Sequence, residues 1–433
     1  MDKSDLKPML KDVKARLLQA ILSAVIVSTI ASTATTVLAD EYHYNSLLIG
    51  DRASGLGGAY IAIADDPSGL YYNPAGTVYT ASSNLSASMN AFNITSTKYK
   101  EVLGPGVDWE RNSSLLIPNF FGITQPLGPG TLGFSYAVTD SAFEDQDQEF
   151  SLANDTKFII NFNNTDTTIN AGPSYAITIG QNFSIGLTLY GVMRTQEQVL
   201  NQMFDFKNTD SNDDIYHWEN SYVAREEYGV KPLLGMMFSP TEKISLGLTI
   251  SQTYMMRTSS VYQISCSTTF EPAFGVGACN DSALDTIQQT YSTHREFPLT
   301  VGFGAAYFAT NALALSTSAM YYSPVNGSDT AVLNASAGFE LYVTDTLAIR
   351  SGVYTNYANT DELKAGVLNA NPEHVDMYGG SLSFTSFTRS SSLTLGLTGS
   401  YGTGKAQVIE GSPNLNDVVA MTLTAFMSAA YSY

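Results

Sequence analysis

The sequence of 433 residues is poor in charged side chains, in cysteine and, beyond residue 39, in long apolar runs. Charged residues make up 14%, and acidic side chains outnumber basic ones by 40 to 21, for a net charge of −19. A nucleic-acid partner needs a basic surface, so none is expected. No stretch after residue 39 has 18 uninterrupted apolar residues, so no membrane-spanning helix is expected there.

The two cysteines, Cys266 and Cys279, are separated by twelve residues. In an exported chain such a pair usually forms a disulfide that closes one loop. Neither a histidine pair nor a second Cys-x-x-Cys lies nearby, so a zinc site is not expected. We predict no cofactor and no resident metal.

Motifs of soluble enzymes are also missing. The sequence has four histidines and contains no Gly-x-Ser-x-Gly, no His-Glu-x-x-His and no nucleotide-binding loop. We therefore predict that the chain is not an enzyme and that it uses no ATP.

One acidic loop carries a fragment of calcium-loop spacing, formed by Asp210, Asn212, Asp213 and Asp214. Ile215 stands where such a loop needs glycine, and no glutamate completes it. A solvated acidic loop is the better interpretation. Divalent cations that bridge the loop to lipopolysaccharide are the alternative left open.

Residues 1–39 have the pattern of a cleaved export signal. Five basic residues precede an apolar stretch over 17–30, and Val37-Leu38-Ala39 ends in small residues. Because residues 17–39 carry no charge, an uncleaved membrane anchor is the alternative. We expect cleavage near Ala39 and a mature chain in the outer membrane.

From residue 83 to 433 the sequence repeats one pattern, in which apolar residues alternate with small or polar ones for about ten positions before a turn. Phe183, Ile185, Leu187 and Leu189 form one face of such a segment, and Leu132, Phe134, Tyr136 and Val138 form that of another. Period-two alternation of this kind is typical of transmembrane β-strands, and the apolar set should face lipid. Fourteen strands are predicted, at 83–94, 114–127, 131–143, 167–178, 183–199, 221–238, 244–262, 293–309, 313–324, 331–343, 347–358, 376–388, 392–406 and 417–433.

A β-sandwich also has alternating strands. The polar positions here are rich in Gly, Ser and Thr rather than Lys and Glu, and short and long connections alternate, which favours a barrel with short periplasmic turns. The last strand ends on an aromatic residue, Tyr433, like the C-terminal signal read by the barrel-assembly machinery, where Phe is usual. The prediction is an all-β, fourteen-stranded antiparallel transmembrane β-barrel.

Residues 40–82 lack the alternating pattern of residues 83–433 and carry a family resemblance. The segment contains Gly55-Leu56-Gly57-Gly58-Ala59, then Ala64-Asp65-Asp66, then Asn73-Pro74-Ala75. In this order and spacing these elements resemble the hatch of the FadL-like outer-membrane transport family. The resemblance implies that the segment plugs a fourteen-stranded barrel, and that solutes leave sideways near a kinked third strand. It places Asn73, Pro74 and Ala75 near a kink at 131–143.

The chemistry of these residues suits a compact hatch. Gly55, Gly57 and Gly58 let the backbone approach the wall where a Cβ atom would collide. Pro74 favours a turn. Asp65 and Asp66 can accept hydrogen bonds from local backbone or from an arginine in the lumen.

Alternation also indicates which side chains face the lumen. Arg194, Lys231 and Arg350 point inward and are candidate partners for a ligand carboxylate, although each could instead pair with an acid such as Glu227. The inward apolar residues are candidate pocket residues or ordinary packing against the hatch: Val192, Leu233, Met237 and Phe426. Phe120 and Phe121 form another apolar pair, and the loop residues Phe270, Ala273 and Phe274, between the two cysteines, are candidates for an outer apolar groove.

The leading hypothesis is passive uptake of hydrophobic solutes, above all long-chain fatty acids, through a hatch-gated barrel with a lateral exit. Aromatic hydrocarbons are an alternative cargo. Rival hypotheses are a docking barrel for exported surface proteins and an open polar porin. The expected partners are outer-membrane lipid and lipopolysaccharide, a hydrophobic small molecule and the barrel-assembly machinery, and the barrel is expected to be a monomer.

Overall fold

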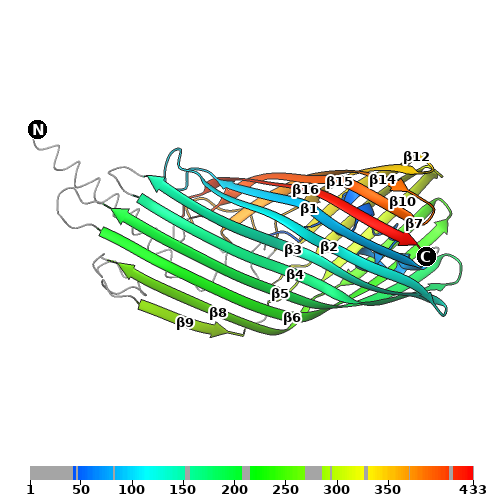
Figure 1. Cartoon of the computed structure of the whole chain (residues 1–433), viewed down its shortest axis with the longest axis horizontal. Coiled ribbons are helices and arrows are strands. Elements are labelled where there is room, and N and C mark those ends of the chain that lie inside the picture. The colour runs from blue at the N-terminus through cyan, green and yellow to red at the C-terminus, as the bar shows by residue number, and fades with distance from the viewer. Residues whose placement is uncertain are drawn as a thin grey trace, which may run out of the picture.

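A computed structural model of the chain describes residues 42–44, 47–80, 83–151, 157–206, 215–268, 285–292, 295–325, 330–369, 371–408 and 413–432. Within them, sixteen strand segments form one antiparallel sheet (Figure 1). The sheet closes on itself, because the first segment pairs with the last and the fifth with the sixth. The segments are β1 (Asn84–Tyr99), β2 (Trp109–Leu127), β3 (Gly130–Ser151), β4 (Lys157–Ile179), β5 (Phe183–Phe206), β6 (Ile215–Thr241), β7 (Ile244–Ser251), β8 (Tyr254–Thr268), β9 (Asp285–Tyr291), β10 (Thr300–Thr310), β11 (Leu313–Tyr322), β12 (Val332–Thr344), β13 (Leu347–Asn356), β14 (Glu373–Phe387), β15 (Ser391–Ala406) and β16 (Asn416–Ser432).

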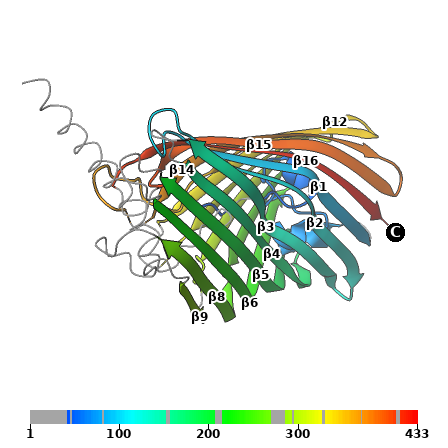
Figure 2. The same cartoon turned by 60° about the vertical axis from the view of Figure 1, so that its left-hand side comes forward.

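The sixteen segments make fourteen barrel strands. β7 and β8 pair in succession along the same strand, β6, and are separated only by Gln252 and Thr253. β10 pairs with β7 and β9 pairs with β8, so these two are likewise halves of one strand. The predicted fourteen-stranded barrel is confirmed. Several strands are longer than predicted, among them β3 to β6, which lie side by side in Figure 2.

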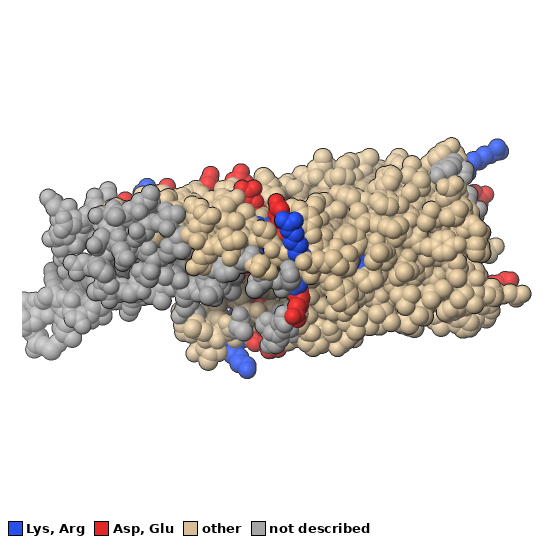
Figure 3. Space-filling model, turned by 90° about the horizontal axis from the view of Figure 1, so that it is seen from below, with Lys and Arg blue, Asp and Glu red and all other residues tan. Residues whose placement is uncertain are grey.

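The alternation predicted from the sequence determines which face of each strand meets lipid. In β5, Ser184 and Thr188 are fully buried, whereas Leu187 and Leu189 are each 50% exposed. Figure 3 shows a broad outer surface of the barrel free of Lys, Arg, Asp and Glu, with charged side chains gathered on either side of it. An apolar outer belt of this kind is what a membrane-spanning barrel requires.

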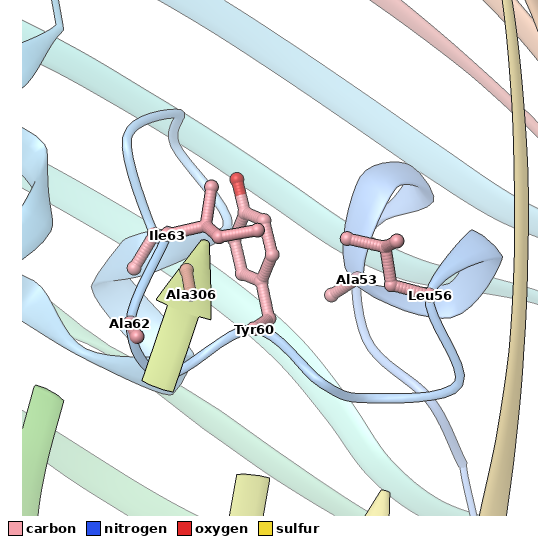
Figure 4. Close-up of a cluster of buried hydrophobic side chains, with 7 residues drawn as sticks. Ala53, Leu56, Tyr60, Ala62, Ile63 and Ala306 are labelled. Carbon is pink, nitrogen blue, oxygen red and sulfur yellow. The ribbon is translucent and has the colours of Figure 1, made fainter. Parts of the chain in front are cut away.

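The predicted hatch lies inside the barrel as three short helices, α2 (Asp51–Gly55), α3 (Gly69–Tyr72) and η1 (Pro74–Tyr79). Its apolar side chains form a small core with the wall, in which Ala53, Leu56, Tyr60 and Ile63 pack together with Ala306 of β10 (Figure 4). No helix in the described part of the chain is long and apolar enough to cross a membrane.

Glycines of the wall make room for the hatch backbone. A Cβ atom at Gly186 of β5 would stand 2.6 Å from the backbone nitrogen of Ala75, and one at Gly338 of β12 would stand 2.7 Å from the carbonyl oxygen of Leu56. Real Cβ atoms do not approach so closely, so these two wall positions must lack a side chain. At these positions the hatch and the wall fit one another backbone to backbone.

The hatch glycines follow the prediction in two cases of three. A Cβ atom at Gly57, where φ is +66°, would stand 3.1 Å from the backbone of Gly352, and one at Gly55 would overlap Ser383 of β14. For Gly58 the expected approach to the wall is wrong. Its neighbour is Leu48 of the hatch itself, and its φ of +83° is what calls for glycine.

The Asn-Pro-Ala element also lies elsewhere than expected. The Asn73 amide donates to the carbonyl of Met236 in β6, and the Ser184 hydroxyl of β5 donates to the carbonyl of Ala75. Placing these residues at a kink of the third strand was wrong, because Gly186 and Gly235 open the space that they fill against β5 and β6.

Several predictions fall on residues outside the described ranges. They concern the export signal at 1–39, the acidic loop at 210–214 and the apolar loop residues Phe270, Ala273 and Phe274. Cys266, at the end of β8, is disulfide-bonded, and its predicted partner Cys279 also lies outside the described ranges.

Candidate functional site

The barrel wall has a break between β2 and β3. Their ladder runs from Leu127 opposite Gly130 to Phe120 opposite Ala137 and resumes only at Ser113 opposite Glu144. Residues 114–119 and 138–143 therefore face one another without ladder pairing. We call this stretch the wall gap.

Two local features of the sequence explain the wall gap. Pro118 has no backbone N–H and cannot donate to a neighbouring strand. Thr139 is an extra residue in β3, because Val138 and Asp140 pair with consecutive residues of β4. At the bulge the predicted alternation is wrong. Val138 was expected to face lipid but is only 3% exposed.

Behind the wall gap lies the N-terminal part of the hatch. The Asn119 amide donates to the carbonyl of Leu48 at 3.0 Å. Ile49 is fully buried against Phe120 and Ala137, the last ladder pair before the gap. The hatch thus closes the wall gap from the inside.

A cavity of about 120 Å³ lies between the hatch and the wall and reaches Thr139 at the gap. The hatch side is made by Leu47, Leu48, Ile61, Tyr71 and Tyr72. The wall side combines apolar and hydroxyl side chains, including Leu233, Met320, Tyr322, Thr249 and Ser318. The lining is therefore mixed, with apolar and polar side chains side by side. A concave site that combines apolar surface with polar groups can hold a small molecule.

Lys231 of β6 is the cationic residue that lines this cavity. Its ammonium lies 5.5 Å from the ring centroid of Tyr71 in α3, a cation–π contact between wall and hatch. No carboxylate of the described residues pairs with it. Lys231 is half-buried. An ammonium that is partly removed from water and has no anionic partner is costly, so a ligand carboxylate would be stabilised here.

The other two predicted cations already have partners. Arg194 bonds Asp166 at 2.6 Å and Glu227 at 3.1 Å, and all three side chains are buried. Arg350 bonds Glu340 at 2.8 Å and the Thr385 hydroxyl. Pairing with acids of the lumen was the alternative interpretation of both residues.

The apolar candidates separate in a similar way. Leu233 lines the cavity next to Lys231. Val192, Met237 and Phe426 are buried in the lumen but are not among the residues that line this cavity. Phe426 instead packs against Gly396 of the neighbouring strand. A role for these three in contacting ligand stays a prediction.

An ion-pair network that sequence reasoning missed holds the hatch to the wall. The Arg52 guanidinium binds both carboxylate oxygens of Glu340 in β12, with Nη2 2.6 Å from Oε2, and it also pairs with Asp65. Asp51 accepts from the Thr394 hydroxyl of β15 at 2.7 Å. Arg52 lies three residues before Gly55, so its position in the hatch was visible in the sequence, but its partner Glu340 was not.

Asp66 accepts hydrogen bonds within its own loop, from the Ser68 backbone at 2.7 Å and from the Ser68 hydroxyl at 2.5 Å. Burial, followed by the negative charge of Asp51, raises the pKa of the Asp66 carboxyl from 3.8 to about 6. The hatch therefore contains an acid that titrates in mildly acidic conditions.

The fold and the site define a class: a transmembrane β-barrel of fourteen strands with a folded plug in its lumen. Known structures share it. A FadL homologue from Pseudomonas aeruginosa matches with a TM-score of 0.65 and 13% identity, over 90% of this chain and 99% of that one. The toluene transporter TodX of P. putida matches at 0.62 and 12%, over 90% and 99%.

The Ralstonia pickettii toluene transporter TbuX gives 0.57 and 11% over the same shares. No protein-family model matches the sequence, and no curated protein does. At this level of identity the likeness is one of fold, and it confirms the FadL-like fold that the hatch motif indicated.

Proposed function

We propose that the chain is an outer-membrane channel through which hydrophobic solutes diffuse passively, leaving sideways through the wall gap into the membrane. One observation carries the proposal: the cavity between the hatch and the wall, which is lined by Leu47, Leu48, Ile61 and Leu233 beside polar side chains, reaches Thr139, the bulged residue at the gap. A hydrophobic solute in this cavity is therefore next to a place where the wall lacks ladder hydrogen bonds. The solute's own gradient supplies the driving force.

The hatch is the gate of this route. Leu47 and Leu48 form part of the cavity, and Ile49 packs behind the gap. The cavity is close in size to the engineered apolar cavity of about 150 Å³ that takes up benzene. A long alkyl chain needs more room, so its passage requires these residues to move.

Lys231 selects among hydrophobic solutes. The solved toluene transporters are named for a neutral ring, whereas an ammonium without an anionic partner favours a solute with a carboxylate. We propose hydrophobic carboxylic acids as the cargo, with long-chain fatty acids as the first class to test. Neutral aromatic hydrocarbons are the alternative cargo.

The route is tested by blocking it at Thr139. Thr139→Trp fills the side of the cavity that meets the wall gap, and Val353→Trp, at a site that is 62% exposed on the outer wall, is the matched control. Both variants are checked for heat-dependent electrophoretic mobility, which reports a folded barrel. Fatty-acid uptake is then measured in cells whose outer membrane contains no other fatty-acid transporter. We expect uptake to fall at least tenfold in Thr139→Trp only, and unchanged uptake would overturn the lateral route.

A further inference from the structure

The wall gap ends, on the side away from the β2–β3 turn, at a buried ion pair between Arg111 of β2 and Glu144 of β3. Arg111 Nε lies 3.1 Å from Glu144 Oε1, and Nη2 lies 2.8 Å from Oε2. Glu144 is the residue at which the ladder resumes, opposite Ser113. We propose that this pair is a latch that sets the length of the wall gap and so the bulk of the solutes that leave through it. Only the second part of this inference, the effect on the bulk of the solutes, rests on the proposed function.

At the end of the wall gap and beyond it, side chains rather than a continuous ladder join the two strands. The Phe143 N–H donates to the Ser113 hydroxyl at 3.1 Å. The amides of Gln146 and Gln148 donate to the carbonyls of Asn112 and Glu110, at 3.3 and 2.9 Å. In this region the only ladder pair is Ser113 with Glu144. Because the ladder contributes so little there, the ion pair is the main link between the strands.

The surroundings hold the two charges in place. The Arg111 guanidinium lies 5.2 Å from the ring centroid of Phe162 and 6.0 Å from that of Trp109. The Asn164 amide donates to Glu144 Oε2 at 3.0 Å. The exposed fractions of the two side chains are only 12% and 9%, so solvent screens the pair little. This is a positioned pair and not a transient surface contact.

A second buried pair in the same lumen shows what is special about the latch. Arg194 of β5 and Asp166 of β4 are even more buried, but the ladder between their two strands is continuous through this region. Their separation is already set by backbone hydrogen bonds. Losing that pair should therefore not widen the wall, and it provides the matched control.

The test uses three variants of the full-length protein. Arg111→Met with Glu144→Gln removes both charges of the pair together, so that neither partner is left as a lone ion. Arg111→Glu with Glu144→Arg exchanges the charges and can rebuild the pair. Arg194→Met with Asp166→Asn and Glu227→Gln is the control for loss of a buried ion pair, because Arg194 also pairs with buried Glu227. All are checked for a folded barrel by electrophoretic mobility.

The first readout does not depend on transport. Hydrogen exchange is followed by mass spectrometry on peptides covering 109–119 and 138–148 of the purified protein. We expect exchange to be at least tenfold faster in the charge-free variant, partly or fully restored in the charge-exchanged variant, and unchanged in the control. Exchange that is the same in the charge-free variant and the unaltered protein would overturn the latch.

The second readout is selectivity. Uptake of hexadecanoic acid is compared with uptake of the same acid carrying a terminal pyrene. We expect the ratio of bulky to linear uptake to rise at least threefold without the latch and to return towards its original value in the charge-exchanged variant. Faster exchange with an unchanged ratio would overturn the role in selectivity. An unaltered protein that takes up neither acid would overturn the proposed function, while the exchange result would still decide the latch.

Discussion

Gly352 of β13 lies directly against Leu56 of the hatch. A Cβ atom at Gly352 would overlap the carbonyl group of Leu56 and would stand 2.6 Å from the backbone nitrogen of Gly57. Neither neighbour is the end of a flexible side chain, so the hatch could accept a larger residue only by shifting as a unit. The position of the hatch against the wall therefore depends on residue 352 having a hydrogen atom as its side chain.

Gly352→Ala is expected to displace the hatch while leaving the barrel closed. Overpacking of a tight contact typically costs about 1–3 kcal/mol, here at the hatch–wall contact. The measurement is limited proteolysis of residues 47–80 in the purified protein. Gly380→Ala is the control, because the nearest atom to its Cβ would be 3.6 Å away, an ordinary contact. Equal protection in the two variants would show that the hatch is not held at Gly352.

Glu340→Gln is expected to be among the most destabilising single substitutions in the lumen. Glu340 is 1% exposed and pairs with both Arg52 and Arg350, so its loss leaves two buried cations without their shared anion. Breaking a buried pair from one side costs about 3–5 kcal/mol. The free energy is read from denaturant unfolding in detergent micelles. Glu149→Gln, which breaks an exposed pair with Lys157, should leave it unchanged.

The sequence was informative about the barrel because lipid imposes a simple rule on every strand. Alternation placed Leu187 outside and Thr188 inside, and it correctly turned Arg194, Lys231 and Arg350 towards the lumen. It did not show which of the three has a carboxylate partner. That depends on register: Arg194 lies opposite Glu227 and Arg350 opposite Glu340, whereas Lys231 lies opposite Tyr190.

The wall gap was beyond what alternation reveals. Pro118 was visible in the sequence, but a proline matters to a wall only through the strand that it fails to bond. The bulge at Thr139 is a single extra residue in β3 relative to β4, and the Arg111–Glu144 pair closes a distance of 33 positions. The unpaired stretch at Pro118, the bulge and the ion pair each depend on how two strands align. The alternation of apolar and polar residues within one strand does not reveal that alignment.

Lys231→Met is expected to separate charged from neutral ligands. A hydrogen bond to a charged group contributes about 1.5–3 kcal/mol, so affinity for a fatty acid should fall roughly 10- to 100-fold while affinity for toluene changes little. Binding is measured by calorimetry on the protein in nanodiscs. Lys243→Met, in the exposed β6–β7 turn, is the control for loss of a positive charge. A parallel loss for toluene would mean that Lys231 acts on the shape of the cavity.

Docking of the hatch is expected to weaken as the pH rises from about 4 to about 6. The pKa of Asp66 is raised from 3.8 to about 6, chiefly by burial, so the docked hatch favours the neutral carboxyl. Below the lower value the carboxyl is neutral in both the docked and the released hatch. Between the two values only the released hatch is ionised, so each step up in pH favours release, and above about 6 the effect is complete. Asp51 and Asp65 add to the shift in Asp66, while Arg52 and the bonds from Ser68 oppose it. Hydrogen exchange of the hatch at pH 4.5 and 7.0, corrected for the intrinsic rate, checks this. Asp66→Asn should abolish the dependence and keep the hatch docked at pH 7.0, and a dependence that persists in this variant would assign it to another group.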